Sequence, residues 1–163
     1  GKMTTAQETT TPDSGPSKGA EGLRTAGAVR LDYLFVYGTL MRGSIFHKYL
    51  KVPQHQATFV DTAFVQNALL YDCGAYPVLA IGGPEEARVW GEVYSFVEGS
   101  PLLRGRLDYV ENVHGGMFRR LKTMAHLENA EMQVAAWAYV GAGQWWKVGT
   151  QVIPSGRWKD KRN

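Results

Sequence analysis

The fold is decided by residues 31–41, which read LDYLFVYGTLM. The apolar and aromatic residues up to Tyr37 predict a buried strand, and Gly38 and Thr39 end it at once. Backbone N–H groups at such a strand end have no ladder partners, so a cluster of them can bind a carboxylate or a developing oxyanion. Gly38 also lets the backbone approach a ligand, because glycine has no β-carbon. The stretch predicts a strand that ends in an anion-binding turn, although many strands end in this way.

Strand signals dominate the rest of the chain. Further apolar or alternating segments, separated by Gly and Pro turns, lie at residues 57–71, 77–81, 88–97, 118–127 and 132–140. The first of these is long enough for one bent strand or for two. With residues 31–37 the segments give about six short strands, which favour a small closed or nearly closed β-barrel.

Two helices are predicted beside these strands. A short helix is expected within residues 44–50. A second helix is expected to begin at Ser100, which can cap it, with Pro101 in its first turn, and to end at the glycine pair of residues 115–116. Its buried stripe, spaced i, i+4, i+7, consists of Leu103, Leu107 and Val110.

Glu111 is the residue of this second helix that has two interpretations. It lies at the border of the apolar stripe and in the last turn, where partial burial and the helix dipole both raise a carboxylate pKa. It is either an edge-of-core glutamate whose head reaches solvent or a base with a tuned pKa. Helix geometry leaves both open. Asp108 and Arg104 are expected to be ordinary surface charges.

Composition limits the class of protein. The 163 residues are 44% hydrophobic and 12% aromatic, enough for one domain with a core but not for two. The net charge of +3 is concentrated near the C-terminus, which argues against a nucleic-acid-binding groove. The single cysteine, Cys73, excludes an internal disulfide framework and fits a reducing compartment. Without a signal peptide or a membrane-spanning run, a soluble cytoplasmic protein is expected.

Three regions are predicted along the chain. Residues 1–28 contain almost no large apolar side chains, so a disordered leader is expected, with residues 1–2 a cloning remnant ahead of Met3. The folded domain is expected at residues 29–158. Residues 159–163 are expected to form a basic tail.

Five segments, in this order along the chain, together resemble one known family. They are FVYGTLM at 35–41, GAYP at 74–77, VWGEVY at 89–94, LDYVE at 107–111 with FRR at 118–120, and AYV at 138–140. They resemble the γ-glutamylcyclotransferase family, and more closely its γ-glutamylamine cyclotransferase-like branch, which includes the butirosin-pathway deacylase type. The resemblance covers roughly residues 33–158. It implies an α+β fold, a small mixed β-barrel of about six strands flanked by helices, with no metal and no cofactor.

The resemblance also implies roles for individual residues. The loop formed by Tyr37, Gly38, Thr39 and Leu40 would hold the γ-glutamyl part of the substrate through its backbone groups. Glu111 would be the catalytic acid and base, and Tyr139 would lie near the substrate. The implied reaction is attack of the substrate's own α-amine on its γ-amide, which releases 5-oxoproline and a free amine.

This chain departs from the family pattern at two positions. Asn112 stands where the family commonly has Gly, and Phe118 stands where it commonly has Tyr. The second change removes a hydroxyl from the region of the pocket. Both departures put the identity of the substrate in doubt, and the leaving amine and the oligomeric state stay open.

Other functions have weaker support in the sequence. Cys73 could be a nucleophile, but no histidine is placed beside it by the sequence, so a packed thiol is favoured. The four histidines show no metal-ligand spacing. The main alternative is a non-catalytic module that binds γ-glutamyl compounds or other small amines on the same fold.

Overall fold

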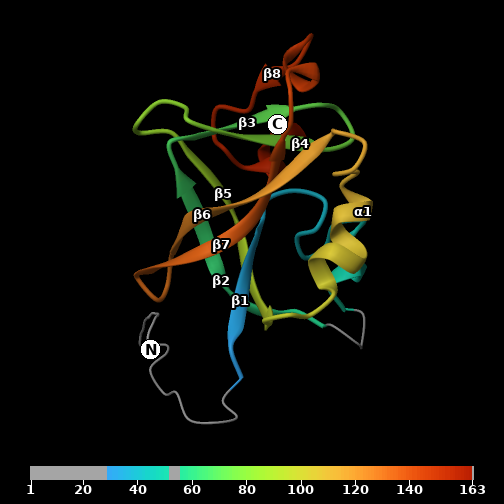
Figure 1. Ribbon diagram of the computed structural model, residues 1–163. Coiled ribbons are helices and arrows are strands. Elements are labelled where there is room, and N and C mark those ends of the chain that lie inside the picture. Colours follow the sequence, from blue (N-terminus) through green and yellow to red (C-terminus); the bar gives the residue numbers. More distant parts are fainter. Residues whose placement is uncertain (1–28, 52–55, 163) are drawn as a thin grey trace. The chain divides into compact units, whose positions relative to one another are not determined.

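The computed structural model describes residues 29–51 and 56–162 (Figure 1). The predicted disordered leader, residues 1–28, lies outside the described residues, as does Asn163 of the predicted basic tail.

Five strands close into a barrel. In order around it they are β1 (Leu31–Val36), β5 (Arg88–Val97), β2 (Thr58–Gln66), β6 (Phe118–Leu127) and β7 (Met132–Gly141). The return from β7 to β1 is a parallel pairing, with Leu34 opposite Trp137, and the other four pairings are antiparallel. Closure leaves no barrel strand with a wholly free edge. The predicted α+β fold with a small mixed β-barrel is confirmed.

Three more strands extend the sheet beside the barrel. β4 (Pro77–Ile81) pairs in parallel with β7, β3 (Ala68–Asp72) pairs antiparallel with β4, and β8 (Gln151–Val152) pairs with β3. The predicted segment 57–71 is therefore two strands, β2 and β3. Asn67 turns the chain between them with a φ of 58°. The sheet has eight strands instead of about six, and β8 has only two residues, too few to show a pattern in the sequence.

Both faces of β1 are buried, which explains its continuous apolar run. Phe35 belongs to a cluster that receives residues from all five barrel strands and fills the interior. Many of these interior residues are alanines, because a five-stranded barrel leaves little room inside. Leu34 and Val36 belong to a second cluster, which includes the leucines of the segment that precedes Glu111. The strand thus joins the barrel interior to the helix outside.

That helix begins as predicted and ends earlier than predicted. Leu102 N donates to Ser100 Oγ at 3.1 Å, which caps the start. A π-helical segment, η3 (Leu103–Leu107), continues into α1 (Asp108–Val110), the coiled ribbon beside the barrel in Figure 1. The expected end at residues 115–116 is wrong, because Asn112 already takes a left-handed conformation, with a φ of 53°.

The remaining helices are short 3-10 turns. They are η1 (His47–Lys51), η4 (Trp145–Lys147) and η5 (Trp158–Arg162). The first lies within and just beyond the segment 44–50 for which a helix was predicted. In the part of the chain that the structure describes, the helices are all too short to cross a membrane.

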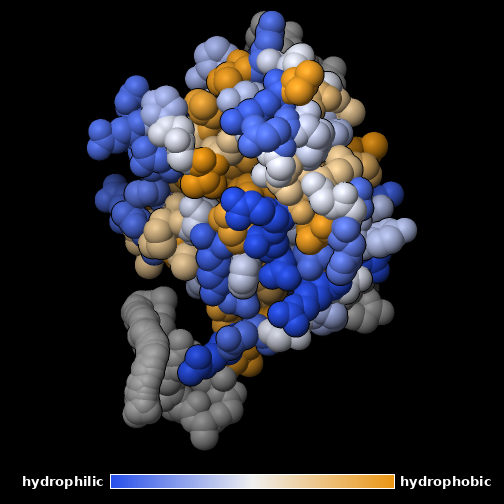
Figure 2. All heavy atoms as spheres, turned by 45° about the horizontal axis from the view of Figure 1, so that its top comes forward, coloured by the Kyte–Doolittle hydropathy of each residue, from blue (hydrophilic) through white to orange (hydrophobic). Residues whose placement is uncertain are grey.

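The surface is mixed in character. On the face shown in Figure 2, hydrophobic residues are interspersed with hydrophilic ones. Large apolar side chains are exposed at scattered positions, among them Ile45, Tyr109 and Val148. Single exposed apolar residues are normal in folded proteins, so they do not by themselves mark a site.

Candidate active site

A cavity of about 240 Å³ lies where the loop after β1, the end of α1, the β3–β4 turn and the start of β6 meet. Its wall includes all six residues that the sequence nominated as site residues: Tyr37, Gly38, Thr39, Leu40, Glu111 and Tyr139. The rest of its wall is apolar or aromatic: Phe35, Val36, Phe46, Tyr76, Pro77, Val110, Met117 and Phe118. The structure thus brings the strand-end turn and Glu111, more than seventy residues apart in the chain, to one cavity.

The loop after β1 carries unused backbone donors. The carbonyl oxygens of Gly38 and Thr39 accept hydrogen bonds from Met41 N at 3.0 Å and Phe46 N at 2.9 Å. The N–H groups of Gly38, Thr39 and Leu40 donate to no acceptor among residues 29–51 and 56–162. The carbonyls therefore hold the shape of the loop, and three N–H groups are available to a ligand.

Gly38 is required by packing. A β-carbon placed on it would lie 2.5 Å from Cγ and 2.7 Å from Cδ of Pro77. Real β-carbons do not approach other carbons so closely, so any other residue would push the loop away from the β3–β4 turn. Access for a ligand was the reason expected from the sequence, and contact with the Pro77 ring is a second one.

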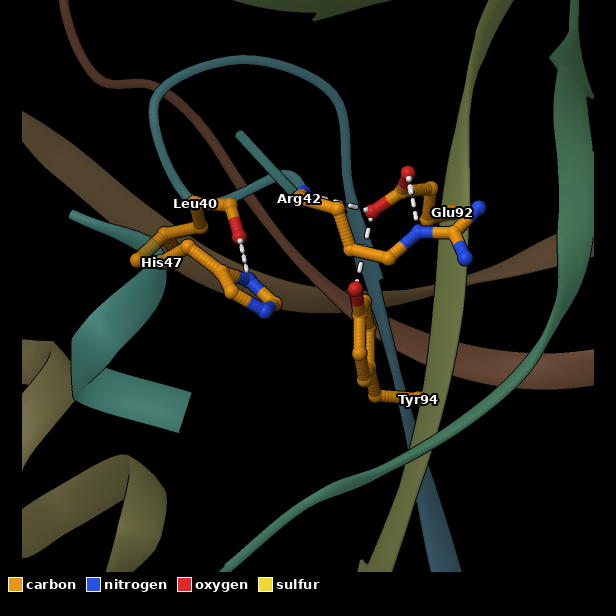
Figure 3. Close-up of polar contacts among 5 residues, drawn as sticks. All are labelled: Leu40, Arg42, His47, Glu92 and Tyr94. Atoms are coloured by element: carbon orange, nitrogen blue, oxygen red, sulfur yellow. Dashed lines mark hydrogen bonds and ion pairs between the residues drawn. The ribbon is translucent and has the colours of Figure 1, made fainter. Parts of the chain in front are cut away.

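A buried carboxylate ties this loop to the barrel (Figure 3). Glu92 of β5, which is 6% exposed, accepts hydrogen bonds through Oε1 from Arg42 N at 3.0 Å and from Tyr94 Oη at 2.9 Å. Its Oε2 accepts from Arg42 Nε at 3.2 Å. On the other side of the loop, His47 Nδ1 donates to Leu40 O at 2.9 Å. These bonds fix the backbone that carries the three unused N–H groups.

Glu92 was not nominated as a functional residue from the sequence. The available signal was an acidic residue in the middle of a strand whose neighbours on both sides are apolar. Such a charge is seldom buried unless it has partners. The partner Arg42 lies fifty residues away, on the loop, so the pattern of β5 alone could not identify it.

The side chain of Tyr37 has a structural role. Its hydroxyl donates to Tyr139 O at 2.6 Å and accepts from Leu79 N at 3.3 Å, which joins the end of β1 to β7 and β4. Burial, and secondly the nearby Glu111, raise the pKa of Tyr37 well above its ordinary value. This phenol is thus a structural hydrogen-bonding group and a poor candidate for moving protons.

Glu111 is half-buried, and its environment differs from that of the buried acids. The three acids classed as buried, Asp61, Glu92 and Asp108, all accept hydrogen bonds from other residues. The carboxylate of Glu111 makes no hydrogen bond or ion pair with any residue in the described part of the chain. Burial against the apolar wall raises the pKa of Glu111 to about 7. A carboxyl group in this state can both accept and donate a proton near neutral pH.

Asp108 was expected on the surface, and that expectation is wrong. The residue is 8% exposed and accepts hydrogen bonds from Arg120 Nε at 2.9 Å, Arg120 Nη2 at 3.1 Å and Tyr139 Oη at 2.7 Å. Burial alone would raise the pKa of Asp108, but the bonds from Arg120 and Tyr139 outweigh it and lower the pKa. The expectation failed because the π-helical segment shifts the faces of the helix and because Arg120 comes from β6.

Tyr139 lines the cavity with its hydroxyl already engaged. Its proton is donated to Asp108, and burial together with this bond raises the pKa of Tyr139. The residue can therefore offer a ligand its ring and the lone pairs of its oxygen. Its predicted place near a substrate is compatible with this position and stays a prediction.

The two departures from the family pattern have distinct structural settings. Asn112 has a φ of 53°, a left-handed conformation that Asn tolerates better than most residues other than Gly. Asparagine can therefore replace glycine at this helix end. Phe118 is 5% exposed and lies in the cavity wall, so a hydroxyl missing here is missing from the cavity itself.

Cys73 does not belong to the cavity wall. Burial raises the pKa of its thiol, which disfavours the reactive thiolate, and its Sγ lies 3.9 Å from Trp146 O. This environment supports a packed thiol over a nucleophile.

Comparison with known proteins gives the chain a family. The profile described as "Gamma-glutamyl cyclotransferase, AIG2-like" matches residues 34–160. An AIG2-like protein from Mus musculus is similar in structure, with a TM-score of 0.63 and 25% identity over 78% of this chain and 87% of that chain. An uncharacterised protein from Pyrococcus horikoshii has a TM-score of 0.55, with 22% identity over 80% of this chain and 92% of its own.

A third solved structure, named as a γ-glutamyl cyclotransferase, has a TM-score of 0.53 with 16% identity over 76% of this chain and 70% of that one. No curated protein sequence matches significantly. The second and third structures are only 22% and 16% identical to this chain, so their similarity shows the fold alone. The family profile, in contrast, matches most of the chain and shows the family. The protein belongs to the AIG2-like γ-glutamyl cyclotransferase family.

Proposed function

We propose that the protein is a cyclotransferase of the γ-glutamylamine type, which converts a γ-glutamyl amide into 5-oxoproline and a free amine. The observation that carries this proposal is Glu111, a cavity carboxyl with a pKa of about 7 and no partner among the described residues. It shares its cavity with a loop whose three backbone N–H groups are unused. A base and an anion-binding turn are the two elements that lactam formation requires.

The loop supplies position and polarisation. Closure of a five-membered ring is intramolecular, so the protein gains most by holding the γ-glutamyl chain in a curled conformation close to attack. The N–H groups of Gly38, Thr39 and Leu40 bind the substrate's α-carboxylate and face the amide oxygen as it becomes an oxyanion. Glu92 and His47 hold this loop in shape, so the donors are oriented before the substrate binds.

Glu111 moves the protons. The α-amine enters as an ammonium and must lose a proton before its nitrogen can attack the carbonyl carbon of the γ-amide. A new C–N bond then forms, the original amide C–N bond breaks, and the two protons that the ammonium loses finish on the departing nitrogen. No water is consumed. A carboxyl group with a pKa near the working pH can take a proton in one step and deliver it in the next.

A non-catalytic binding module explains this site less well. A module that only binds a γ-glutamyl group needs the loop but has no use for a carboxyl poised between its two protonation states. Burying such a group without a partner is also unfavourable, which makes it an unusual feature to keep in a binding site.

The test is release of 5-oxoproline from a panel of γ-glutamyl amides by the purified protein and by Glu111→Gln. We expect turnover by the parent protein and a loss of about 100-fold or more in kcat for Glu111→Gln, with substrate binding retained by isothermal titration. Full activity of a folded Glu111→Gln protein would contradict the role of Glu111. Binding of γ-glutamyl amides without any 5-oxoproline would favour the binding module.

A further inference from the structure

The cavity has two unlike walls. One wall is the loop after β1, whose unused N–H groups suit a carboxylate or an oxyanion. Another part of the wall comes from the β3–β4 turn and the start of β6, which contribute Tyr76, Met117 and Phe118. If the γ-glutamyl part occupies the loop, the group attached to the amide nitrogen faces this second wall.

The second wall is aromatic and continues to the surface. The rings of Tyr76 and Phe118 lie 6.2 Å apart, centroid to centroid, with their planes at 60°. Trp145, which lies outside the cavity wall, packs against Phe118 at 6.2 Å and against Tyr76 at 6.3 Å. Trp145 is 39% exposed and is fixed by a bond from its Nε1 to Met117 O. The three rings form one cluster, in which Phe118 is buried in the cavity wall and Trp145 is exposed at the surface.

No basic side chain lines this cavity among the residues that the structure describes. Arg42 of the loop is engaged with Glu92, and Arg120 of β6 is engaged with Asp108. Arg119, next to Phe118, is exposed and does not line the cavity. The charged residue in the wall is Glu111, which is an acid. A carboxylate on the departing amine would therefore be buried against apolar rings without a counter-ion, which is costly.

We infer that the amine released by this protein carries an apolar group, an aromatic ring above all, and no carboxylate. The inference rests on the proposed function and makes its substrate class narrower. It excludes amino acids and peptides as preferred leaving groups, because their carboxylate has no partner in the cavity. It predicts that binding energy on this side comes from ring contacts with Tyr76, Phe118 and Trp145.

Three synthetic substrates separate these effects. γ-Glutamyl-2-phenylethylamide and γ-glutamyl-phenylalanine differ only by the carboxylate of the leaving group. γ-Glutamyl-ethylamide differs from the first by the absence of the ring. We expect kcat/KM for the phenylethylamide to exceed that for each of the other two by about tenfold or more.

Two variants test the wall directly. Phe118→Leu keeps an apolar side chain and removes the ring, and we expect it to lose most of the preference for the phenylethylamide over the ethylamide. Phe64→Leu is the matched control, since Phe64 stacks on His126, packs at a tilt against Trp90 of the barrel, and does not line the cavity. It is expected to keep the preference.

Trp145→Arg places a cation at the exposed rim and is expected to raise turnover of γ-glutamyl-phenylalanine relative to the phenylethylamide by about threefold or more.

Different results are expected if the leaving group is wrong and if the proposed reaction is wrong. Equal or better turnover of γ-glutamyl-phenylalanine by the parent protein overturns the inference and leaves the cyclotransferase activity standing. A preference that survives Phe118→Leu unchanged also overturns it. Release of 5-oxoproline from none of these amides, nor from the wider panel, overturns the proposed function together with the inference.

Discussion

Glu111 is a titratable group whose surroundings disfavour its charged form. It is half-buried in a cavity wall that also includes Phe46, Val110 and Met117, and burial raises its pKa to about 7. In the proposed reaction the ionised form of Glu111 removes a proton from the substrate ammonium, so activity should depend on the fraction of Glu111 that is ionised.

We predict that kcat/KM falls as the pH is lowered through about 7. The acidic limb belongs to Glu111, because protonation removes the base. The profile is measured between pH 5 and 9 with one γ-glutamyl amide. In Glu111→Gln the residual activity should lack this limb, and a limb that persists there would assign it to another group.

The same pKa predicts an effect on stability. Because the folded-state pKa of Glu111 is raised above its unfolded value of about 4.5, its contribution is fully present below that value and is lost as the pH rises through about 7. Glu111→Gln should therefore be more stable than the parent by roughly 2–3 kcal/mol at pH 8. At pH 4 the two should unfold alike. Thermal and urea unfolding at both pH values check this, and an equal difference at pH 4 and 8 would contradict it.

Asn112 illustrates how a single backbone conformation limits the choice of residue. Its φ of 53° places it in the left-handed region at the end of the helix that carries Glu111. Asn112→Gly should change the free energy of unfolding by less than about 0.5 kcal/mol, whereas Asn112→Ala should lose about 1 kcal/mol. Urea unfolding of the pair measures the difference. A destabilisation of Asn112→Gly equal to that of Asn112→Ala would mean that the side chain, not the backbone conformation, is what matters.

At the scale of elements, the loop after β1 depends on a carboxylate in β5. Glu92 receives three hydrogen bonds, two of them from Arg42, and it is only 6% exposed, so little water can replace them. Replacing it leaves the loop free to move its N–H groups away from the positions in which we propose that they polarise the substrate.

We predict that Glu92→Gln lowers kcat/KM by about tenfold or more with little change in the pH at which activity is half-maximal. Glu98→Gln is the control, because Glu98 is exposed and follows Val97, which pairs with Leu31 at the end of β1 away from the loop. Steady-state kinetics across pH distinguish the two roles. A shift of the acidic limb in Glu92→Gln would mean that Glu92 titrates with the reaction and does not merely position the loop.

The helix that bears Glu111 is held by a charge pair. Asp108 binds Arg120 through two hydrogen bonds, and Tyr139 adds a third bond to the same carboxylate. Asp108→Asn should destabilise the protein by about 2–3 kcal/mol at pH 7, because it leaves Arg120 without its counter-ion. Chemical denaturation measures this loss, and a change below about 0.5 kcal/mol would show that water replaces the pair.

For the whole molecule, the sequence was sufficient to predict those strands whose bounds follow from their own alternating pattern. The bounds of β5 and β6 match the predicted segments, because alternation along a strand is a local property. The closed barrel follows from short strands whose apolar faces must all be covered. The sequence could not show that β1 closes the barrel by a parallel pairing with β7, since that contact joins residues a hundred positions apart.

The sequence pointed to residues that line one cavity, but it did not reveal the buried charges that support them. The turn at Gly38 and the carboxyl of Glu111 stood out as a strand end and as a charge at the edge of an apolar stripe, and both line one cavity. The burial of Asp108 and of Glu92 was missed because each depends on an arginine from a different element. Buried charges are decided by partners, and partners are set by tertiary structure.

The reaction itself is tested most directly by the product. The purified protein is incubated with γ-glutamyl-2-phenylethylamide, and 5-oxoproline, glutamate and phenylethylamine are quantified together by mass spectrometry. We predict equal amounts of 5-oxoproline and phenylethylamine, no glutamate above the uncatalysed background, and loss of both products in Glu111→Gln. Glutamate in place of 5-oxoproline would mean that water is the nucleophile, and it would contradict lactam formation at this site.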